Sequence, residues 1–136
     1  MLIQVELSKI IIDEKRQDQI IVLKEKSGDR QFPIVIGFLE ASSIKMKLSG
    51  VETPRPMTHD LLAFVIKELE AKVDRLIIDK MVHNTFHAKL EIVSADGKRK
   101  SVDCRPSDGI ALAVRAEASI FVEEEVLKNV EIFKGN

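Results

Sequence analysis

Tryptophan and tyrosine are absent from this chain of 136 residues, and Cys104 is its single cysteine. One cysteine cannot form a disulfide within the chain, so a small scaffold held together by disulfides is excluded. The sequence also lacks a signal-peptide pattern and any apolar run long enough to span a bilayer. We therefore expect a cytoplasmic protein that has no membrane partner.

Neither sign of charge is in excess. Lys and Arg number 21 against 22 Asp and Glu, which gives a net charge of −1. A chain balanced in this way has no general attraction for polyanions, so nucleic-acid binding requires a local cationic patch. Aromatic residues make up 4% of the chain, and none is interleaved with a basic stripe of the kind that stacks single-stranded bases. P-loop, GxGxxG, zinc-ligand and nucleophile-elbow motifs are absent as well.

Hydrophobic periodicity predicts two three-stranded β-meanders with helices between and after them. The predicted strands are residues 2–12, 20–23, 32–36, 76–78, 85–92, a strand ending at Cys104, and 120–122. The predicted helices are residues 37–48, 58–72, a helix beginning near Ser107, and 123–130. This order predicts one α+β domain over residues 1–136, in which helices pack on a mixed, largely antiparallel sheet.

Three details refine this fold prediction. The apolar alternation of residues 2–12 slips by one position at Ser8-Lys9, which predicts a β-bulge. Pro33 removes a backbone donor, so its strand is expected at a sheet edge or in an interrupted ladder. The wide apolar face of residues 58–72 is expected to pack against the sheet.

Two predicted helix starts repeat one pattern. Arg105-Pro106-Ser107-Asp108 and Arg55-Pro56-Met57-Thr58-His59-Asp60 each carry Arg-Pro, then a hydroxyl residue suited to the N-cap, then an acid in the first turn. Proline is tolerated at a helix start, and the helix dipole favours a first-turn carboxylate. If the two starts face each other, their charged side chains converge on one pocket.

Four carboxylates fall at junctions between predicted elements. They are Glu40, Asp60, Asp103 and Asp108. Such oxygen ligands suit a hard divalent cation, as phosphodiester chemistry usually requires. The same residues also fit a structural role, because first-turn acids satisfy free N–H groups and neighbouring loops are often tied by Arg–Asp pairs. Cys104 is expected to pack inertly in the core.

Four motifs occur in a fixed order along the chain. They are Ile36-Gly37 with Glu40-Ala41, Arg55-Pro56-Met57-Thr58-His59-Asp60-Leu61, Thr85-Phe86-His87-Ala88, and Asp103-Cys104-Arg105-Pro106-Ser107-Asp108-Gly109-Ile110-Ala111-Leu112-Ala113. Over nearly the whole chain, this set resembles the bifunctional nuclease family, a small domain of bacteria, archaea and plants. The resemblance implies a single mixed α/β domain, a homodimer, and cleavage of both RNA and DNA.

The polar positions of these motifs are the residues gathered at the junctions. Carried over by position they are Glu40, Arg55, Thr58, His59, Asp60, Thr85, Asp103, Arg105, Ser107 and Asp108. The chain departs from the family at His87, where an aromatic is usual, at Gly109, where alanine is usual, and at Cys104, where a small residue is usual. None of these departures removes a candidate catalytic group.

The leading hypothesis is a nuclease that hydrolyses phosphodiester bonds of RNA or DNA with Mg²⁺ or Mn²⁺. Its predicted metal ligands are Glu40, Asp60, Asp103 and Asp108, and its predicted catalytic residues are His59, Asp60, Asp108, Arg55, Arg105 and Ser107. In this hypothesis His59 activates water, and Arg55 and Arg105 stabilise charge on the phosphoryl group. The alternatives are a non-catalytic ligand-binding or interaction domain, with the same polar cluster as its structural network, and an oligomeric scaffold.

Overall fold

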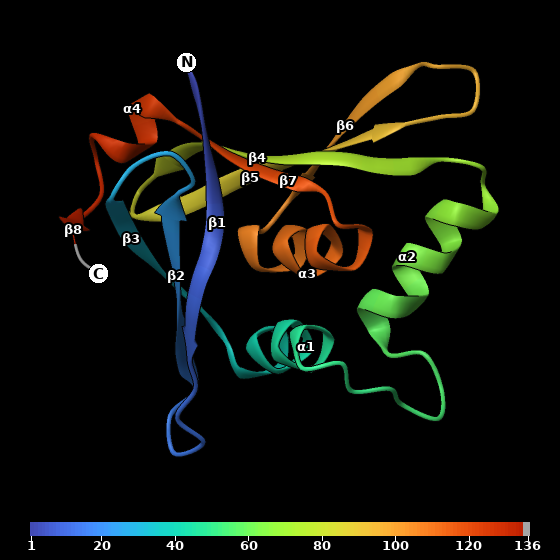
Figure 1. The fold of residues 1–136 in the computed structure, drawn as a ribbon, viewed down its shortest axis with the longest axis horizontal. Coiled ribbons are helices and arrows are strands. Elements are labelled where there is room, and N and C mark those ends of the chain that lie inside the picture. Colours follow the sequence, from blue (N-terminus) through green and yellow to red (C-terminus); the bar gives the residue numbers. More distant parts are fainter. Residues whose placement is uncertain (135–136) are drawn as a thin grey trace.

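The computed structural model describes residues 1–134, which form eight strands and four helices (Figure 1). In chain order these are β1 (Leu2–Ile11), β2 (Asp18–Glu25), β3 (Arg30–Gly37), α1 (Phe38–Leu48), α2 (Thr58–Glu68), β4 (Lys72–Val82), β5 (Thr85–Val93), β6 (Arg99–Cys104), α3 (Pro106–Ala116), β7 (Ser119–Glu123), α4 (Glu124–Leu127) and β8 (Phe133–Lys134). The strands form one sheet in the order β6-β5-β4-β7-β1-β2-β3-β8.

The two predicted meanders, β1–β3 and β4–β6, are both present. Strand β7 lies between them, antiparallel to β1 and parallel to β4, and so joins the meanders into a single sheet. Every other pair of neighbouring strands is antiparallel. The predicted α+β class with a mixed, largely antiparallel sheet is therefore confirmed.

Two local predictions about the first meander are also confirmed. The register between β1 and β2 shifts between Leu7 and Lys9, where the bulge was expected. Strand β8 pairs with β3 only at Arg30 and Gln31, so no described strand pairs with Pro33 on that side. The missing N–H of this proline consequently leaves no gap in the central part of the sheet.

The predicted ends of two helices are wrong. Helix α2 ends at Glu68 and not at residue 72, because Glu70 adopts a left-handed backbone conformation with a φ of 62°. Residues from Lys72 onward instead belong to β4, where they pair with β5. The predicted terminal helix over residues 123–130 is reduced to the four residues of α4. Periodicity located these helices but not the turns that end them.

Helix α3 is the most deeply buried helix of the fold. It packs on β4 and β5 and lies between the sheet and α1, with α2 on its other flank (Figure 1). Its close approach to β4 depends on Gly109, because a Cβ there would lie 2.4 Å from Cδ1 of the fully buried Leu76. Gly109 has a low intrinsic helix propensity, but its lack of a side chain allows α3 to pack closely against β4.

The prediction that the apolar face of α2 packs on the sheet is wrong. Helix α2 leans mainly on α3, and His59 is its only buried residue. Four large apolar side chains of the helix and that of its C-cap residue Leu69 are exposed by 43–73%, and Ile66 is half-buried. We call Leu61, Leu62, Phe64, Val65 and Leu69 the α2 apolar surface. A helix period shows that a face is apolar but not what covers it.

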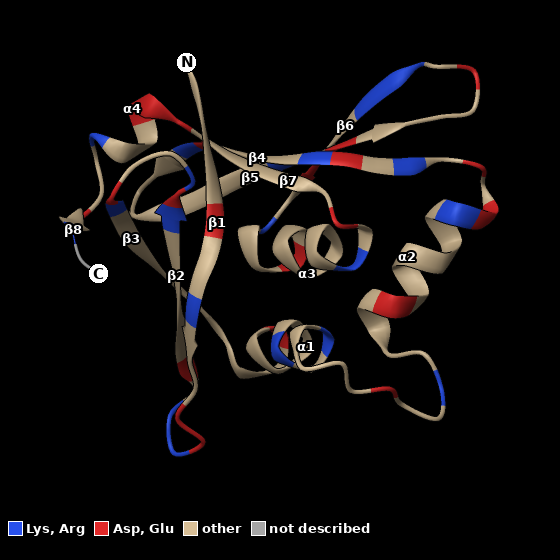
Figure 2. Cartoon of the chain, viewed as in Figure 1, with Lys and Arg blue, Asp and Glu red and all other residues tan. Residues whose placement is uncertain are grey.

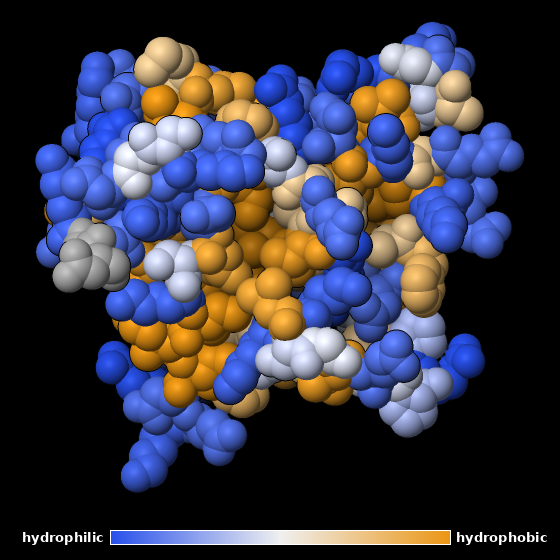
Figure 3. All heavy atoms as spheres, viewed as in Figure 1, coloured by the Kyte–Doolittle hydropathy of each residue, from blue (hydrophilic) through white to orange (hydrophobic). Residues whose placement is uncertain are grey.

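Charged and apolar side chains are distributed differently over the molecule. Lys, Arg, Asp and Glu positions are interspersed along the strands, helices and loops, without one sign dominating the fold (Figure 2). On the face shown in Figure 3, hydrophobic side chains reach the surface in a broad area over the lower parts of β1 and β2. Within residues 1–134, no helix has the length and apolar character needed to cross a bilayer.

Candidate active site

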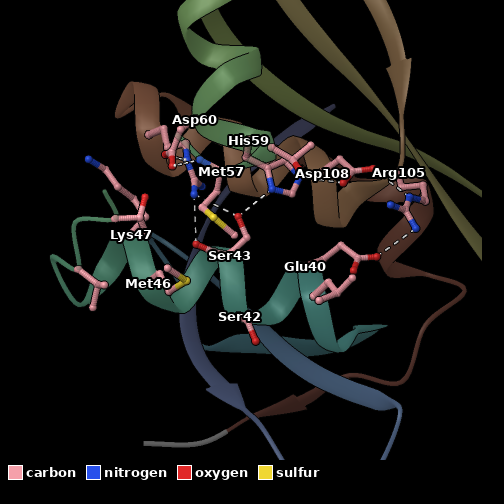
Figure 4. A pocket seen from close by; sticks show the side chains of 15 residues that line it. Glu40, Ser42, Ser43, Met46, Lys47, Met57, His59, Asp60, Arg105 and Asp108 are labelled. Atoms are coloured by element: carbon pink, nitrogen blue, oxygen red, sulfur yellow. Dashed lines mark hydrogen bonds and ion pairs between the residues drawn. The ribbon is translucent and has the colours of Figure 1, made fainter. Parts of the chain in front are cut away.

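A pocket of about 430 Å³ opens where α1 and the starts of α2 and α3 meet. Its wall combines apolar side chains with most of the charged groups singled out in the sequence (Figure 4). The lining residues that matter for its chemistry are Glu40, Ser43, Lys47, His59, Asp60, Arg105, Asp108 and Arg115. The loop between α1 and α2 adds Val51, Thr53 and Met57 to the rim.

The two helix starts have the same construction, although it differs in detail from the prediction. Thr58 and Ser107 were expected to be the N-caps, but the N-caps are Met57 and Arg105. Thr58 is the first helical residue of α2 and Pro106 is the first of α3. Asp60 and Asp108 therefore each occupy the third helical position. From there, Oδ2 of Asp60 accepts a hydrogen bond from the Met57 N–H at 3.0 Å.

His59 lies at the centre of the pocket wall. Its Nε2 is 2.9 Å from Oδ1 of Asp108, and its Nδ1 is 2.7 Å from Oγ of Ser43. The His59 side chain is 11% exposed, so the ring is largely shielded from bulk water. In Figure 4 the ring lies between Ser43 and Asp108. The two helix starts thus face each other and meet at one pocket, which is the condition under which their charged side chains were expected to converge.

Asp108 links the histidine to a cation at the mouth of the pocket. Its Oδ2 accepts from Nε of Arg105 at 2.9 Å, and Nη1 of the same arginine lies 3.1 Å from Oε1 of Glu40. Burial alone would raise the pKa of Asp108, but the bonds from His59 and Arg105 outweigh it and hold that pKa below its usual value. Asp108 is therefore ionised at neutral pH and can only accept hydrogen bonds.

A second ion pair, between Arg115 and Asp60, lies on the other side of His59 and Ser43. Nε of Arg115 donates to Oδ1 of Asp60 at 2.7 Å, and this guanidinium, with the backbone bond from Met57, lowers the pKa of Asp60. Nη2 of Arg115 also donates to Oγ of Ser43 at 3.1 Å. A continuous chain of polar contacts therefore runs from Asp60 through Arg115 and Ser43 to His59.

Ser43 and Arg115 were not among the site residues predicted from the sequence. A signal existed for both: Ser43 follows Glu40 by three residues, and Arg115 follows Asp108 by seven, so each lies on the same helical face as a residue that was chosen. What the sequence did not show is that α1 and α3 turn these faces toward each other.

Three predicted site residues lie outside the pocket wall. Asp103 points from β6 toward β5, where its Oδ1 accepts from Nζ of Lys89 at 3.0 Å. Arg55 is exposed in the loop before α2, and Ser107 is buried in the first turn of α3. The pocket brings together Glu40, His59, Asp60, Arg105 and Asp108.

The donor set in this arrangement does not fit a divalent cation. Both carboxylate oxygens of Asp60 and of Asp108 are engaged by N–H donors, and Arg105 engages Glu40. Within residues 1–134, no three His, Cys, Asp or Glu side chains are grouped so as to hold a metal ion. The Mg²⁺ or Mn²⁺ expected from the sequence stays a prediction, and these residues would have to change partners to bind it.

Cys104 lies behind the pocket, at the end of β6. Burial, with smaller contributions from the charges of Asp108 and Asp103, raises the pKa of its thiol to about 11. At pH 8 the thiolate fraction is then about 0.1%, against roughly a quarter for an ordinary cysteine. We expect iodoacetamide to alkylate the folded protein at least ~10-fold more slowly than the urea-unfolded chain at pH 8. Equal rates, followed by mass spectrometry, would contradict the raised pKa.

A family model described as "Bifunctional nuclease domain" matches residues 21–134. An uncharacterized protein of Mycobacterium tuberculosis is 36% identical over 124 residues, which cover 91% of this chain and 73% of that protein. Bifunctional nuclease 1 of Oryza sativa subsp. japonica is 28% identical over 80% of this chain and 34% of its own length. Bifunctional nuclease 1 of Arabidopsis thaliana is 26% identical over 76% of this chain and 33% of its own.

Proposed function

Because this chain belongs to the bifunctional nuclease family, we propose that it hydrolyses phosphodiester bonds in RNA or DNA. The observation that carries the proposal is the His59–Asp108 pair in the pocket wall, bordered by cationic side chains. A histidine held by a carboxylate is a general acid–base group, and phosphoryl transfer needs such a group next to positive charge.

The pocket supplies that positive charge from three cations. Arg105 is 67% exposed at the mouth, so its guanidinium can contact a phosphate while remaining near Asp108. Lys47 lines the pocket and forms no ion pair with another described residue. Arg115 is buried beside Ser43 and Asp60. Arg105 and Lys47 would bind the substrate phosphate, while Asp108 holds His59 and stabilises the imidazolium that forms.

Replacing His59 tests the proposal directly. We expect His59→Gln to lower the rate of cleavage of a fluorogenic RNA or DNA oligonucleotide by at least ~100-fold, because general acid–base catalysis is lost. His87→Gln is the matched control, since His87 lies on β5 outside the pocket, and its rate should stay within twofold of the parent. Wild-type protein without nuclease activity, or equal activity in both variants, would refute the proposal.

The metal requirement is a separate part of the same assay. Reactions with Mg²⁺, with Mn²⁺ and with EDTA measure whether the predicted cation is needed. Metal-dependent cleavage that Glu40→Gln abolishes would support the predicted ligand set, in which case Arg105 must give up Glu40 when the ion binds. Full activity in EDTA would instead assign the charge stabilisation to Arg105, Lys47 and Arg115.

The same nuclease assay also tests the non-catalytic alternative. In that interpretation the polar chain from Asp60 to Asp108 only fastens α1, α2 and α3 together, and the pocket binds a ligand without converting it. The plant relatives named bifunctional nuclease favour the enzyme. The cytoplasmic location expected from the sequence is untested and stays a prediction.

We further propose that two copies of this chain form a homodimer through the α2 apolar surface. Its five large side chains are 43–73% exposed, and an apolar patch can match its own copy across a two-fold axis. We expect the parent protein to elute as a dimer in light scattering and Phe64→Glu to be monomeric. Val35→Glu is the control, because Val35 is an exposed apolar residue on β3, 62% exposed against 52% for Phe64. A monomeric parent protein would remove this proposal.

A further inference from the structure

We propose that Ser43 is the nucleophile of the reaction, attacking the substrate phosphorus with His59 as its base. This inference rests on the proposed nuclease function and replaces the water activated in the sequence-based hypothesis with a serine hydroxyl. Ser43 lies on the same helical face as Glu40, but its partners come from two other helices, so the sequence alone did not show its contacts.

Hydrogen-bond geometry fixes the direction of proton transfer. Asp108 is ionised and can only accept, so the hydrogen of a neutral His59 ring is on Nε2, 2.9 Å from Oδ1 of Asp108. Nδ1 then carries a lone pair, and the Ser43 hydroxyl, 2.7 Å away, must donate to it. Ser43, His59 and Asp108 therefore form a serine–histidine–aspartate relay, with the two ring nitrogens in the reverse of the order found in serine proteases.

The position of Ser43 also fits a nucleophile. A serine in the middle of a helix usually donates to a carbonyl of the preceding turn, whereas this hydroxyl reaches across to α2. Its oxygen accepts from Nη2 of the buried Arg115 at 3.1 Å, a contact that stabilises negative charge as the proton leaves. Ser43 also lines the pocket, so a bound phosphate can approach it.

The chemistry balances without an additional reactant. In the first step the hydroxyl proton of Ser43 moves to Nδ1 of His59, a bond forms between Oγ and phosphorus, and the bond from phosphorus to the departing nucleoside oxygen breaks. That oxygen takes the proton from His59. In the second step His59 removes a proton from water, which attacks phosphorus, and the Oγ–P bond breaks as Ser43 recovers its proton. Diester and water yield a monoester and an alcohol.

Two measurements test the nucleophile, covalent labelling and oligonucleotide cleavage, and the labelling is carried out without a metal. In EDTA, diisopropyl fluorophosphate should attach covalently to wild-type protein, with the adduct mapped to Ser43 by tandem mass spectrometry. Ser43→Ala should abolish labelling and lower oligonucleotide cleavage by at least ~1,000-fold. Ser42→Ala is the matched control, because Ser42 lines the same pocket on the same helix, and it should retain both properties. If Ser43→Ala does not fold, Ser43→Cys is used in its place, and iodoacetamide should alkylate the cysteine at residue 43.

The outcomes separate this inference from the proposed function. Cleavage by Ser43→Ala within twofold of the parent, combined with its loss in His59→Gln, would overturn the nucleophile and leave a histidine-activated water. Absence of the adduct at Ser43 in an active enzyme would overturn it as well. Labelling of Ser43 in a wild-type protein that cleaves no nucleic acid would support the reactive serine and refute the nuclease.

Discussion

Asp108→Asn is expected to reduce phosphodiester cleavage by about 10³–10⁴-fold while leaving the fold intact. The reason lies in the two neighbours of the side chain. Arg105 requires an oxygen, and the charge-assisted bond it makes is the stronger one, so the amide oxygen turns to Arg105 and the NH₂ group faces His59. Nε2 must then accept, and the ring hydrogen moves to Nδ1, where it blocks proton transfer from Ser43. The imidazolium formed in the reaction also loses its counter-charge.

The shift of the ring hydrogen can be measured apart from catalysis. The ¹⁵N chemical shifts of His59 should show a protonated Nε2 in the parent protein and a protonated Nδ1 in the variant. Asp103→Asn is the control, since Asp103 was a predicted metal ligand but its carboxylate contacts Lys89 outside the pocket. Its activity should stay within twofold of the parent. Unchanged ring nitrogens in Asp108→Asn, or activity within tenfold, would contradict the relay.

The sequence identified much of this site because local rules place its residues. Proline near a helix start and an acid in its first turn are local signals, so Asp60 and Asp108 were identified correctly as first-turn residues. Asp103 was grouped with the other acids because it lies at a junction between predicted elements, and this grouping was wrong. Strand alternation directs its side chain away from that of its neighbour Cys104, and proximity along the chain does not override that direction.

Contacts between distant segments were beyond the sequence. Arg115 and Ser43 are separated by 72 residues, and only the packing of α3 on α1 brings their side chains together. The same limit applies to α2, whose period shows an apolar face but not that the sheet leaves it uncovered. The sequence of one chain does not show what covers the apolar face of a helix, because a second protein molecule can cover it.

Arg115→Met is expected to destabilise the protein by about 2–4 kcal/mol in urea denaturation. The guanidinium is 7% exposed and donates to Asp60, to the backbone oxygens of Ala111 and Ser43, and to the Ser43 hydroxyl. Methionine fills a similar volume but leaves these acceptors without a donor, and Asp60 without its counter-charge. Arg55→Met is the control, because Arg55 is exposed outside the pocket, and it should change stability by less than about 0.5 kcal/mol.

The pH dependence of this loss assigns it to the ion pair. The folded-state pKa of Asp60 is lowered, chiefly by Arg115, so the pair stabilises the fold above the unfolded pKa of about 4 and loses this effect as pH falls through the folded value. The stability gap between parent and variant should therefore be full at pH 6 and should narrow below pH 4. A double-mutant cycle with Asp60→Asn should give a coupling energy of about 1–3 kcal/mol. A gap independent of pH, with no coupling, would show that Arg115 acts through its backbone contacts and packing alone.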